Sequence, residues 1–385
     1  KMPDAMFFET AADQTHVTFT PTQTYYTFAC GPVALKVIFT APLLMDDLDL
    51  MSRPVNYISY QVESADGKAH DVQLYLEATS AWATNVPGQA VESAVILKPE
   101  GLQYAMTGTV DQPVLQTKGD DVRIDWGHFY LAAPQKESVT FGASDFMSLK
   151  KEFAAAGSIS RGRNIDDPNQ EHSLAMVDNL GSVKDAASGY AMIAYDDDYA
   201  IQYFNDNRMA YWKHNGQVSI DQVLLQASKD YDPVMQRCRT FDEQLMNDTR
   251  TAGGEQYAEL CALVYRQILA AHKLVEDKNG NLLYFSKENF SNGSIGTVDI
   301  TYPSSPLFLV YNPELLKGMM NFIFEYSESG RWQKPFAAHD VGTYPQANGQ
   351  TYGGDMPVEE SGNMLILTTA IALREGNADY AKKHW

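Results

Sequence analysis

The 385-residue sequence is poor in cysteine and has no long apolar run. Its three cysteines, Cys30, Cys238 and Cys261, lie far apart, and no C-x-x-C motif occurs. This number and this spacing exclude a disulfide framework and a zinc site built from thiolates. No stretch approaches the roughly 18 consecutive apolar residues that a membrane-spanning helix needs, so the sequence predicts no membrane partner.

The common motifs of nucleotide binding and hydrolysis are also missing. The sequence has no Walker loop, no G-x-G-x-x-G, no G-x-S-x-G and no H-E-x-x-H. Most of its histidines lack the spacing of metal ligands, and from them we predict neither a metal site nor any other cofactor. These histidines are His16, His70, His128, His172, His214, His272 and His384.

Positive charge is scarce, because 29 Lys and Arg face 49 Asp and Glu, which gives a net charge of -20. Nucleic acids and anionic membranes are negatively charged and bind positively charged proteins, so the net charge argues against both as partners. Hydrophobic residues make up 44% and aromatic residues 11% of the chain, enough to bury large cores. The length favours two domains.

Residues 1–230 have the pattern of a β domain. Two alternating runs, 57–64 and 71–78, flank Asp66-Gly67, which predicts a hairpin. Residues 190–195 and 199–204 predict a second hairpin. Further strands are expected at 25–30, 33–40, 122–126, 129–132, 139–142 and 218–225, and a helix at 144–156. Many short strands with turn signals predict a large antiparallel β-sandwich.

Residues 231–385 change to a helical period. Apolar residues at spacings of three and four predict a helix over 257–275, and Pro313 begins a second one that reaches Glu328. Two more helices are expected, one from Glu359 and one from Asn377. These helices are too few to enclose one another, so we expect the helical domain to be incomplete at its C-terminus.

Three polar loops between these helices each carry carboxylates. The segments 289–303, 338–345 and 355–363 combine glycine, hydroxyl and amide groups with acidic residues. Sites are commonly built on loops at one end of a rigid scaffold, and paired carboxylates can divide acid and base work. Structural roles are the alternative: the helix dipole alone favours Glu359 and Glu360 in a first turn, Asp299 could cap a helix, and His339-Asp340 could be a structural pair.

The same loops resemble one known family. Gly296-Thr-Val-Asp-Ile-Thr-Tyr-Pro303, His339-Asp-Val-Gly-Thr-Tyr-Pro345 and Met356-Pro-Val-Glu-Glu-Ser-Gly-Asn-Met364 are similar to the glutaminase A family of fungi and Bacteroides-type bacteria. The resemblance implies a β + α multidomain fold, in which a large antiparallel β-sandwich is followed by part of an (α/α) helical toroid of the six-hairpin glycosidase kind. It also implies a secreted or periplasmic hydrolase that converts L-glutamine to L-glutamate and ammonia. The family's chain continues past the point that matches Trp385, so a missing C-terminal helical segment is the expected partner.

Chemistry and motif position together suggest roles for the loop residues. Hydrolysis of an amide needs a base for water, a proton donor for ammonia and stabilisation of the oxyanion. We expect Glu360 to be the general base or acid, Asp340 its carboxylate partner and His339 a proton shuttle or oxyanion donor, with Glu359 as a further catalytic candidate. The candidate substrate-binding residues are Asn292, Asp299, Tyr302, Arg331, Trp332 and Tyr344, and Arg331 would hold the substrate carboxylate.

Two other functions fit the same residues. The helical toroid is shared with inverting glycosidases, which use two separated carboxylates and a water, so the fold does not decide between amide and glycosidic substrates. Trp332, Tyr302 and Tyr344 could then stack on sugar rings. A non-catalytic carbohydrate-binding protein, with the sandwich as the binding module, is the third possibility.

Overall fold

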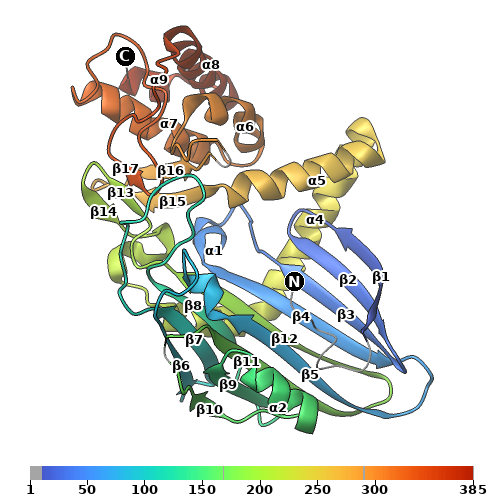
Figure 1. Cartoon of the computed structure of the whole chain (residues 1–385). Coiled ribbons are helices and arrows are strands. Elements are labelled where there is room, and N and C mark those ends of the chain that lie inside the picture. The colour runs from blue at the N-terminus through green and yellow to red at the C-terminus, as the bar shows by residue number, and fades with distance from the viewer. Residues whose placement is uncertain (1–10, 168, 289–290, 385) are drawn as a thin grey trace.

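The larger sheet of the protein has eight antiparallel strands. The computed structural model describes residues 11–167, 169–288 and 291–384. The strand order is β1-β2-β3-β4-β12-β8-β7-β6 (Figure 1). The bounds are β1 Asp13–Phe19, β2 Gln23–Cys30, β3 Val33–Thr40, β4 Val55–Ser64, β6 Val91–Lys98, β7 Leu102–Thr109, β8 His128–Pro134 and β12 Ala186–Asp196.

A smaller sheet packs on one face of the larger one. Its order is β10-β9-β11-β5, with β5 His70–Thr79, β9 Val139–Asp145, β10 Gly162–Asn164 and β11 His172–Val183. Leu131 of the larger sheet shares a buried cluster with Phe141 and Met176 of the smaller one. The β-sandwich predicted from the sequence is confirmed, although β9 and β10 are parallel.

The opposite face of the larger sheet is covered by helices α1 (Leu48–Ser52), α3 (Ile220–Lys229) and α4 (Tyr231–Gly253). Side chains on a strand point alternately to the two faces, and β4 illustrates this. The Tyr57 hydroxyl donates to the carbonyl of Ala227 in α3, whereas that of Tyr60 donates to Asp178 in the smaller sheet. The central strands are therefore buried on both sides.

Both predicted hairpins are wrong in their pairing, although their main strands exist. β4 pairs with β3 and β12, whereas β5 pairs with β11, so the Asp66-Gly67 turn carries the chain from one sheet to the other. Likewise β12 does not pair with the next strand, β13 (Ile201–Tyr203), which pairs with β14 (Asp206–Arg208) and β17 (Gln346–Ala347). Turn residues reverse the chain, but the burial of each strand's faces selects its neighbours.

Three other expected elements differ. Residues 122–126 form no regular strand, and residues 218–225 lie mostly in helix α3, which begins at a capping box between Ser219 and Gln222. Helix α5 (Glu255–Ala270) ends early, because the chain then forms a hairpin of β15 (His272–Glu276) and β16 (Leu282–Ser286). The expected helix near 144–156 is α2 (Ser148–Ala156), and 3₁₀ helices lie at Ser80–Ala83 and Tyr211–Gly216.

The remaining helices gather at one end of the molecule, away from the sandwich (Figure 1). They are α6 (Val298–Tyr311), α7 (Pro313–Glu328), α8 (Pro357–Glu375) and α9 (Asp379–Lys383). The helix at 313–328 is confirmed, but the C-terminal part of the expected 289–303 loop is the start of α6. Residues 289 and 290 of that loop lie outside the described residues. One apolar cluster joins Met192 of the sheet, Leu224 of α3 and Leu367 of α8.

A loop of the β domain reaches the C-terminal loops and fixes their position. The N–H of Gly119 donates to the carbonyl of Tyr344 at 3.1 Å, and Lys287 Nζ donates to the carbonyl of Asp120 at 2.5 Å. Gly293 has a φ of +69°, and a Cβ on it would lie 2.6 Å from the Gly119 carbonyl oxygen. Only glycine permits both that conformation and that approach.

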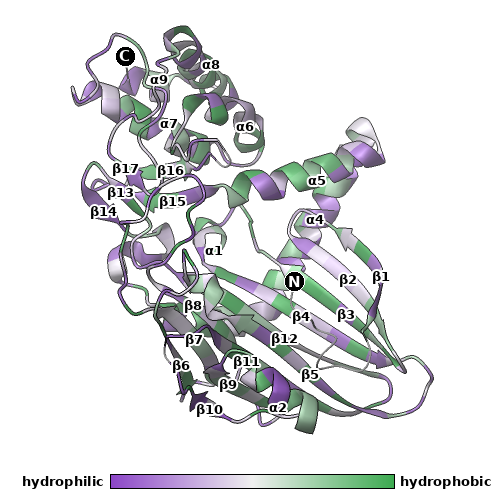
Figure 2. Ribbon diagram, in the orientation of Figure 1, coloured by the Kyte–Doolittle hydropathy of each residue, from purple (hydrophilic) through white to green (hydrophobic). Residues whose placement is uncertain are grey.

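Several helices expose large apolar side chains. Leu365 and Leu373 of α8 are 71% and 79% exposed, and Leu260 of α5 is 55% exposed. Figure 2 shows the hydrophobic bands along α5. Among the described residues, no helix has both the length and the apolar character to span a membrane.

Candidate active site

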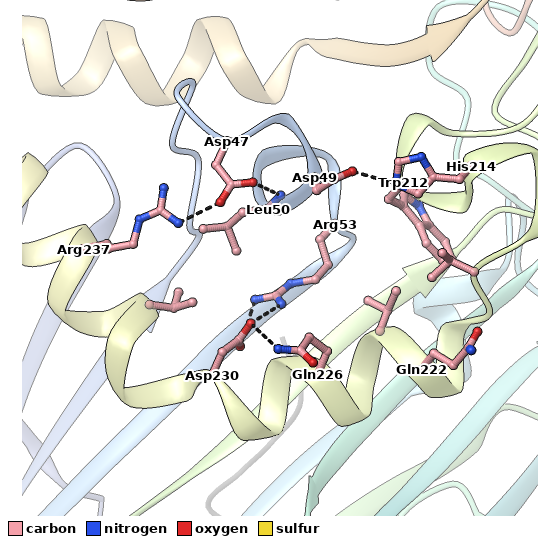
Figure 3. A pocket seen from close by; sticks show the side chains of 13 residues that line it. Asp47, Asp49, Leu50, Arg53, Trp212, His214, Gln222, Gln226, Asp230 and Arg237 are labelled. Atoms are coloured by element: carbon pink, nitrogen blue, oxygen red, sulfur yellow. Dashed lines mark hydrogen bonds and ion pairs between the residues drawn. The ribbon is translucent and has the colours of Figure 1, made fainter. Parts of the chain in front are cut away.

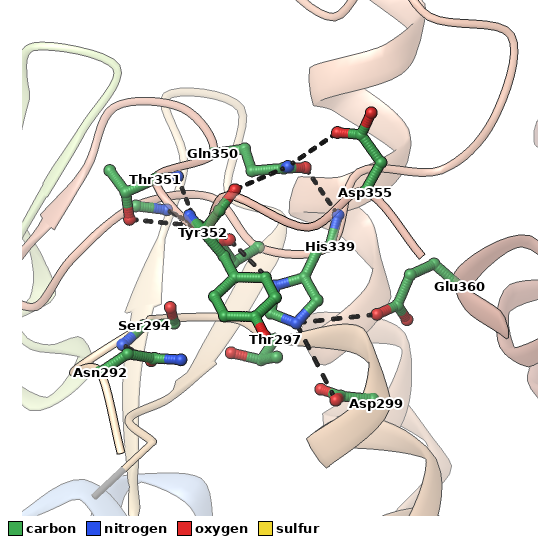
Figure 4. Close-up of polar contacts among 12 residues, drawn as sticks. Asn292, Ser294, Thr297, Asp299, His339, Gln350, Thr351, Tyr352, Asp355 and Glu360 are labelled. Carbon is green, nitrogen blue, oxygen red and sulfur yellow. Dashed lines mark hydrogen bonds and ion pairs between the residues drawn. The ribbon is translucent and has the colours of Figure 1, made fainter. Parts of the chain in front are cut away.

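Two carboxylates and one imidazole converge between helices α6 and α8. His339 Nε2 lies 3.9 Å from Asp299 Oδ2 and 4.0 Å from Glu360 Oε1. One ligand-type atom from each residue lies within 4.8 Å of the other two, and all three side chains point toward one space (Figure 4). We call Asp299, His339 and Glu360 the convergent cluster.

Local structure explains how residues so distant in sequence meet. Thr297 occupies the N-cap position of α6 and puts Asp299 in its first turn, while Pro357 begins α8 and puts Glu360 in its first turn. His339 lies on the segment between α7 and α8. This segment is tied to the start of α6, because the N–H of Val298 donates to the carbonyl of His339 at 2.9 Å.

Asp340 faces away from the cluster and orients His339. It is fully buried and accepts hydrogen bonds from the N–H groups of Gly342, Thr351 and Tyr352 at 2.9, 3.0 and 3.2 Å. His339 Nδ1 lies 3.0 Å from Asp340 Oδ2, and because a carboxylate accepts, Nδ1 carries the proton. In the neutral ring, the lone pair of Nε2 is then directed at the cluster.

Glu360 is a buried carboxyl group with little compensation for its burial. Its side chain is 0% exposed, and neither oxygen has a hydrogen-bond partner within the described part of the chain. Burial, reinforced by the charge of Asp299, raises the pKa of Glu360 to about 8, although His339 and Asn363 act in the opposite direction. Perturbed groups of this kind are typical of functional sites.

The other two members of the cluster are also perturbed. Burial raises the pKa of Asp299 above its ordinary value, and Asp299 Oδ1 lacks a partner among the residues described. Burial alone would lower the pKa of His339. The hydrogen bond to Asp340 and the charges of Asp299 and Glu360 outweigh it, so the pKa is raised.

Three residues near the cluster were not predicted. The ring of Tyr352 stacks on His339 with centroids 4.3 Å apart, and it is 41% exposed. Gln350 accepts a hydrogen bond from the His339 N–H at 2.9 Å. The buried Thr297 hydroxyl has no partner in the described ranges. The glycine-rich run 352–354, directly before the third loop, is the signal that could have drawn attention to Tyr352.

Several predicted site residues lie outside the convergent cluster. Glu359 and Tyr302 are exposed on α8 and α6, and Asn292 accepts from the N–H of Ser294 in a turn. The Tyr344 ring lies under Lys287 Nζ at 5.1 Å.

Arg331 and Trp332 belong to a different contact. Arg331 lies 4.4 Å over the Phe204 ring and 3.6 Å from Glu325. Trp332 packs on Tyr326 and donates to a backbone carbonyl. The structure thus brings together Asp299, His339, Asp340 and Glu360 of the predicted set.

A polar cavity of about 420 Å³ lies between α1, α3 and α4, away from the convergent cluster (Figure 3). Its charged groups are already paired. Arg53 lies 2.9 Å from Asp230, and Arg237 lies 2.8 Å from Asp47. These pairs neutralise one another, so we interpret this cavity as a structural ion-pair network between the sheet and its helices.

Two family models match the chain. A domain of unknown function (DUF5127) matches residues 22–248, and the glutaminase A six helical-hairpin domain matches residues 254–385. Fold and sequence together define a two-domain protein in which a β-sandwich precedes a helical domain of the six-hairpin class. The chain belongs to the glutaminase A family.

The chain is similar in sequence to two fungal proteins. The chain is 31% identical to "Glutaminase A" of Aspergillus oryzae, over 97% of this chain and 55% of that protein. It is 27% identical to "Probable glutaminase" of Arthroderma benhamiae, over 88% of this chain and 41% of that protein. The chain therefore spans about half the length of these relatives.

Solved structures of a family GH92 α-mannosidase from Bacteroides thetaiotaomicron, with and without mannoimidazole, also match. They share 10% sequence identity and cover 96% of this chain and 43–44% of theirs, with TM-scores of 0.36 and 0.37. A similarity this low carries no functional conclusion.

Proposed function

We propose that the protein hydrolyses the side-chain amide of L-glutamine to L-glutamate and ammonia, and that the convergent cluster is where this happens. The observation that carries the proposal is the meeting of Asp299, His339 and Glu360 within 4.8 Å in the region that matches the glutaminase A six helical-hairpin domain. The names of the two fungal relatives favour an amide substrate.

The cluster has the groups that amide hydrolysis requires. Water must be activated, negative charge on the amide oxygen must be stabilised, and the departing nitrogen must gain a proton. Asp340 holds the His339 ring so that Nε2 faces the reacting groups. Tyr352 stacks on that ring and is partly exposed, so it can contact a small substrate.

The test is ammonia release by the protein expressed from its full reading frame. We expect saturable release from L-glutamine and no turnover of a panel of aryl glycosides. Hydrolysis of glycosides without hydrolysis of glutamine would overturn the proposal. Saturable polysaccharide binding without turnover of either substrate would replace it with a carbohydrate-binding role.

Glycoside hydrolysis by the same loops is the second candidate, and one distance speaks against its inverting form. Inverting glycosidases keep their two carboxyl groups about 6.5–9.5 Å apart to admit a water. The facing oxygens of Asp299 and Glu360 lie within 4.8 Å of each other. The exposed ring of Tyr352, which stacks on His339, is what favours a sugar.

We also propose that further helices of the family's domain cover the exposed apolar faces of α5 and α8. Leu365, Ile366 and Leu373 line one groove on α8, and the fungal relatives have about as much chain again to supply a cover. Apolar patches of this kind favour association. Residues 1–385 behaving as a monodisperse monomer that hydrolyses glutamine would contradict this.

Secretion or location in the periplasm remains our proposal for the site of action, on the basis of the family resemblance. Fractionation of a tagged protein in its own host tests it. Recovery in the cytosol would refute it.

A further inference from the structure

We propose that the convergent cluster binds a divalent transition-metal ion through Asp299, His339 and Glu360, with Zn²⁺ the best match to its donors. The donor atoms are Asp299 Oδ2, His339 Nε2 and Glu360 Oε1 (Figure 4). One imidazole and two carboxylates suit borderline ions such as Zn²⁺. Three protein ligands that leave a fourth position open are the pattern of a catalytic rather than a structural zinc site.

The separations of the donor atoms are close to those of a bound ion. His339 Nε2 lies 3.9 Å from Asp299 Oδ2 and 4.0 Å from Glu360 Oε1. Zinc bonds to nitrogen and oxygen are about 2.0–2.2 Å long, which places two ligands of one ion roughly 3–4 Å apart. The two carboxylate oxygens lie within 4.8 Å of each other, so the side chains would have to move inward to bind one ion. Both carboxylates lie on helical first turns.

The buried oxygens of the cluster point independently to a cation. Glu360 is fully buried, and both of its oxygens lack a hydrogen-bond partner in the ranges that the structure describes. Asp299 Oδ1 is in the same condition. Buried polar atoms in folded proteins almost always have partners, so orphaned oxygens beside a free imidazole lone pair require an explanation. A cation among them supplies it.

The surroundings of His339 are those of a metal ligand. Metal-binding histidines almost always donate their other ring N–H to a carboxylate or carbonyl, which fixes the tautomer. His339 Nδ1 does this to Asp340, and Asp340 is itself held by the N–H groups of Gly342, Thr351 and Tyr352. This arrangement holds Nε2 ready to bind.

The consequence for catalysis rests on the proposed function. A bound ion lowers the pKa of a water in its open position and can polarise the amide carbonyl. The water oxygen then bonds to the amide carbon, the carbon–nitrogen bond breaks, and the nitrogen leaves as ammonia with a proton taken from the water. The products are glutamate and ammonia, with no oxidant or further reactant.

The test is direct binding of Zn²⁺ to the protein expressed from its full reading frame, after dialysis against EDTA and without glutamine. Calorimetry is expected to show one tight site, and Mn²⁺, Ca²⁺ and Mg²⁺ serve as comparison ions. Glu360→Gln and, separately, Asp299→Asn should each weaken binding at least about 100-fold, while circular dichroism confirms that they fold. Glu314→Gln, the same change in the first turn of α7, should bind as the wild type does.

Two results would overturn the proposal: no binding by the wild type, or equal binding by both cluster variants. Because no substrate is present, the outcome is independent of glutaminase activity. If the protein binds Zn²⁺ tightly but does not hydrolyse glutamine, the metal site is supported and glutamine is rejected as the substrate. If the protein hydrolyses glutamine fully in excess EDTA and binds no Zn²⁺, glutamine is supported as the substrate and the metal site is rejected.

Discussion

Two buried carboxylates, one beside the sandwich and one in the C-terminal helices, have opposite surroundings. Asp242 of α4 is 2% exposed and accepts hydrogen bonds from Thr20 Oγ1, from the N–H of Thr22 and from Thr22 Oγ1 at 2.5, 2.9 and 2.9 Å. Glu360 of α8 is 0% exposed and accepts none from the described residues. The hydrogen bonds of Asp242 connect α4 to the segment just before β2, whereas Glu360 makes no such connection among the described residues.

We interpret Asp242 as a residue that stabilises the fold and Glu360 as a residue with the function proposed above. A buried polar group without a partner costs stability, roughly 1–3 kcal/mol or more when charged. Three hydrogen bonds offset part of the cost of burying Asp242. Glu360 has no such hydrogen bonds within the described residues, and we attribute its burial to the role proposed for it with a substrate or ion. The following variants test this comparison.

The largest effect is expected from Glu360→Gln. Removing its charge should lower kcat/KM for glutamine by about 10²–10⁴-fold, because the cluster loses either a proton-transfer group or a ligand. Glu359→Gln, one position along α8 and exposed, should lower it far less. Ammonia release under steady-state conditions measures both. Equal losses in the two variants would show that burial does not mark the functional carboxylate.

Asp242→Ala should instead destabilise the fold. It removes three hydrogen bonds and leaves the Thr22 N–H without its acceptor, so we expect the free energy of unfolding to fall by about 2–4 kcal/mol. Urea denaturation measures this. Turnover per folded molecule should stay at the wild-type value. A loss of turnover would show that Asp242 is not only a structural residue.

The contribution of Asp242 should also depend on pH with a definite sign. Burial raises its folded pKa from 3.8 to about 6, so this carboxyl group stabilises the fold fully below about pH 4. As the pH rises toward 6 the unfolded state ionises first, and the contribution is lost, on the order of 2–3 kcal/mol. The difference in unfolding free energy between wild type and Asp242→Asn, measured from pH 4 to 7, isolates it. A difference that grows with pH would contradict the assignment.

Asp340→Asn should have a smaller effect on chemistry than Glu360→Gln. The amide can still accept from the backbone, but it no longer fixes the His339 tautomer, so kcat should fall about 10–100-fold with little change in KM. A change confined to KM would mean that Asp340 positions the substrate rather than the imidazole.

The sequence allowed the strands to be predicted better than their partners. Alternation located β2, β3, β8 and β9, because it reports which faces are buried. Alternation could not show that β4 and β5 belong to different sheets. The same residues of each strand would be buried whether the two strands paired with each other or with strands of two packed sheets. The strand expected at 218–225 failed because the capping signal of Ser219 and Gln222 outweighs a short β-like run.

The candidate site was predictable in its members but not in their arrangement. Asp299, His339 and Glu360 could be named because each lies in a polar loop beside a helix. That Asp340 orients His339, and that Arg331 packs on Phe204, depend on contacts across the fold that no local pattern encodes. Tyr352 was missed because a single aromatic ring in a glycine-rich run gives little signal.

The most direct test of the central claim is the stability of Glu360→Met, measured in EDTA so that only the protein's own groups contribute. Methionine has a similar shape and no polar oxygens, and replacing an unsatisfied buried polar group by an apolar one is neutral or stabilising. We predict an inactive protein whose free energy of unfolding equals or exceeds that of the wild type. A variant that is several kcal/mol less stable, as expected for a structural residue such as Asp242, would contradict the account.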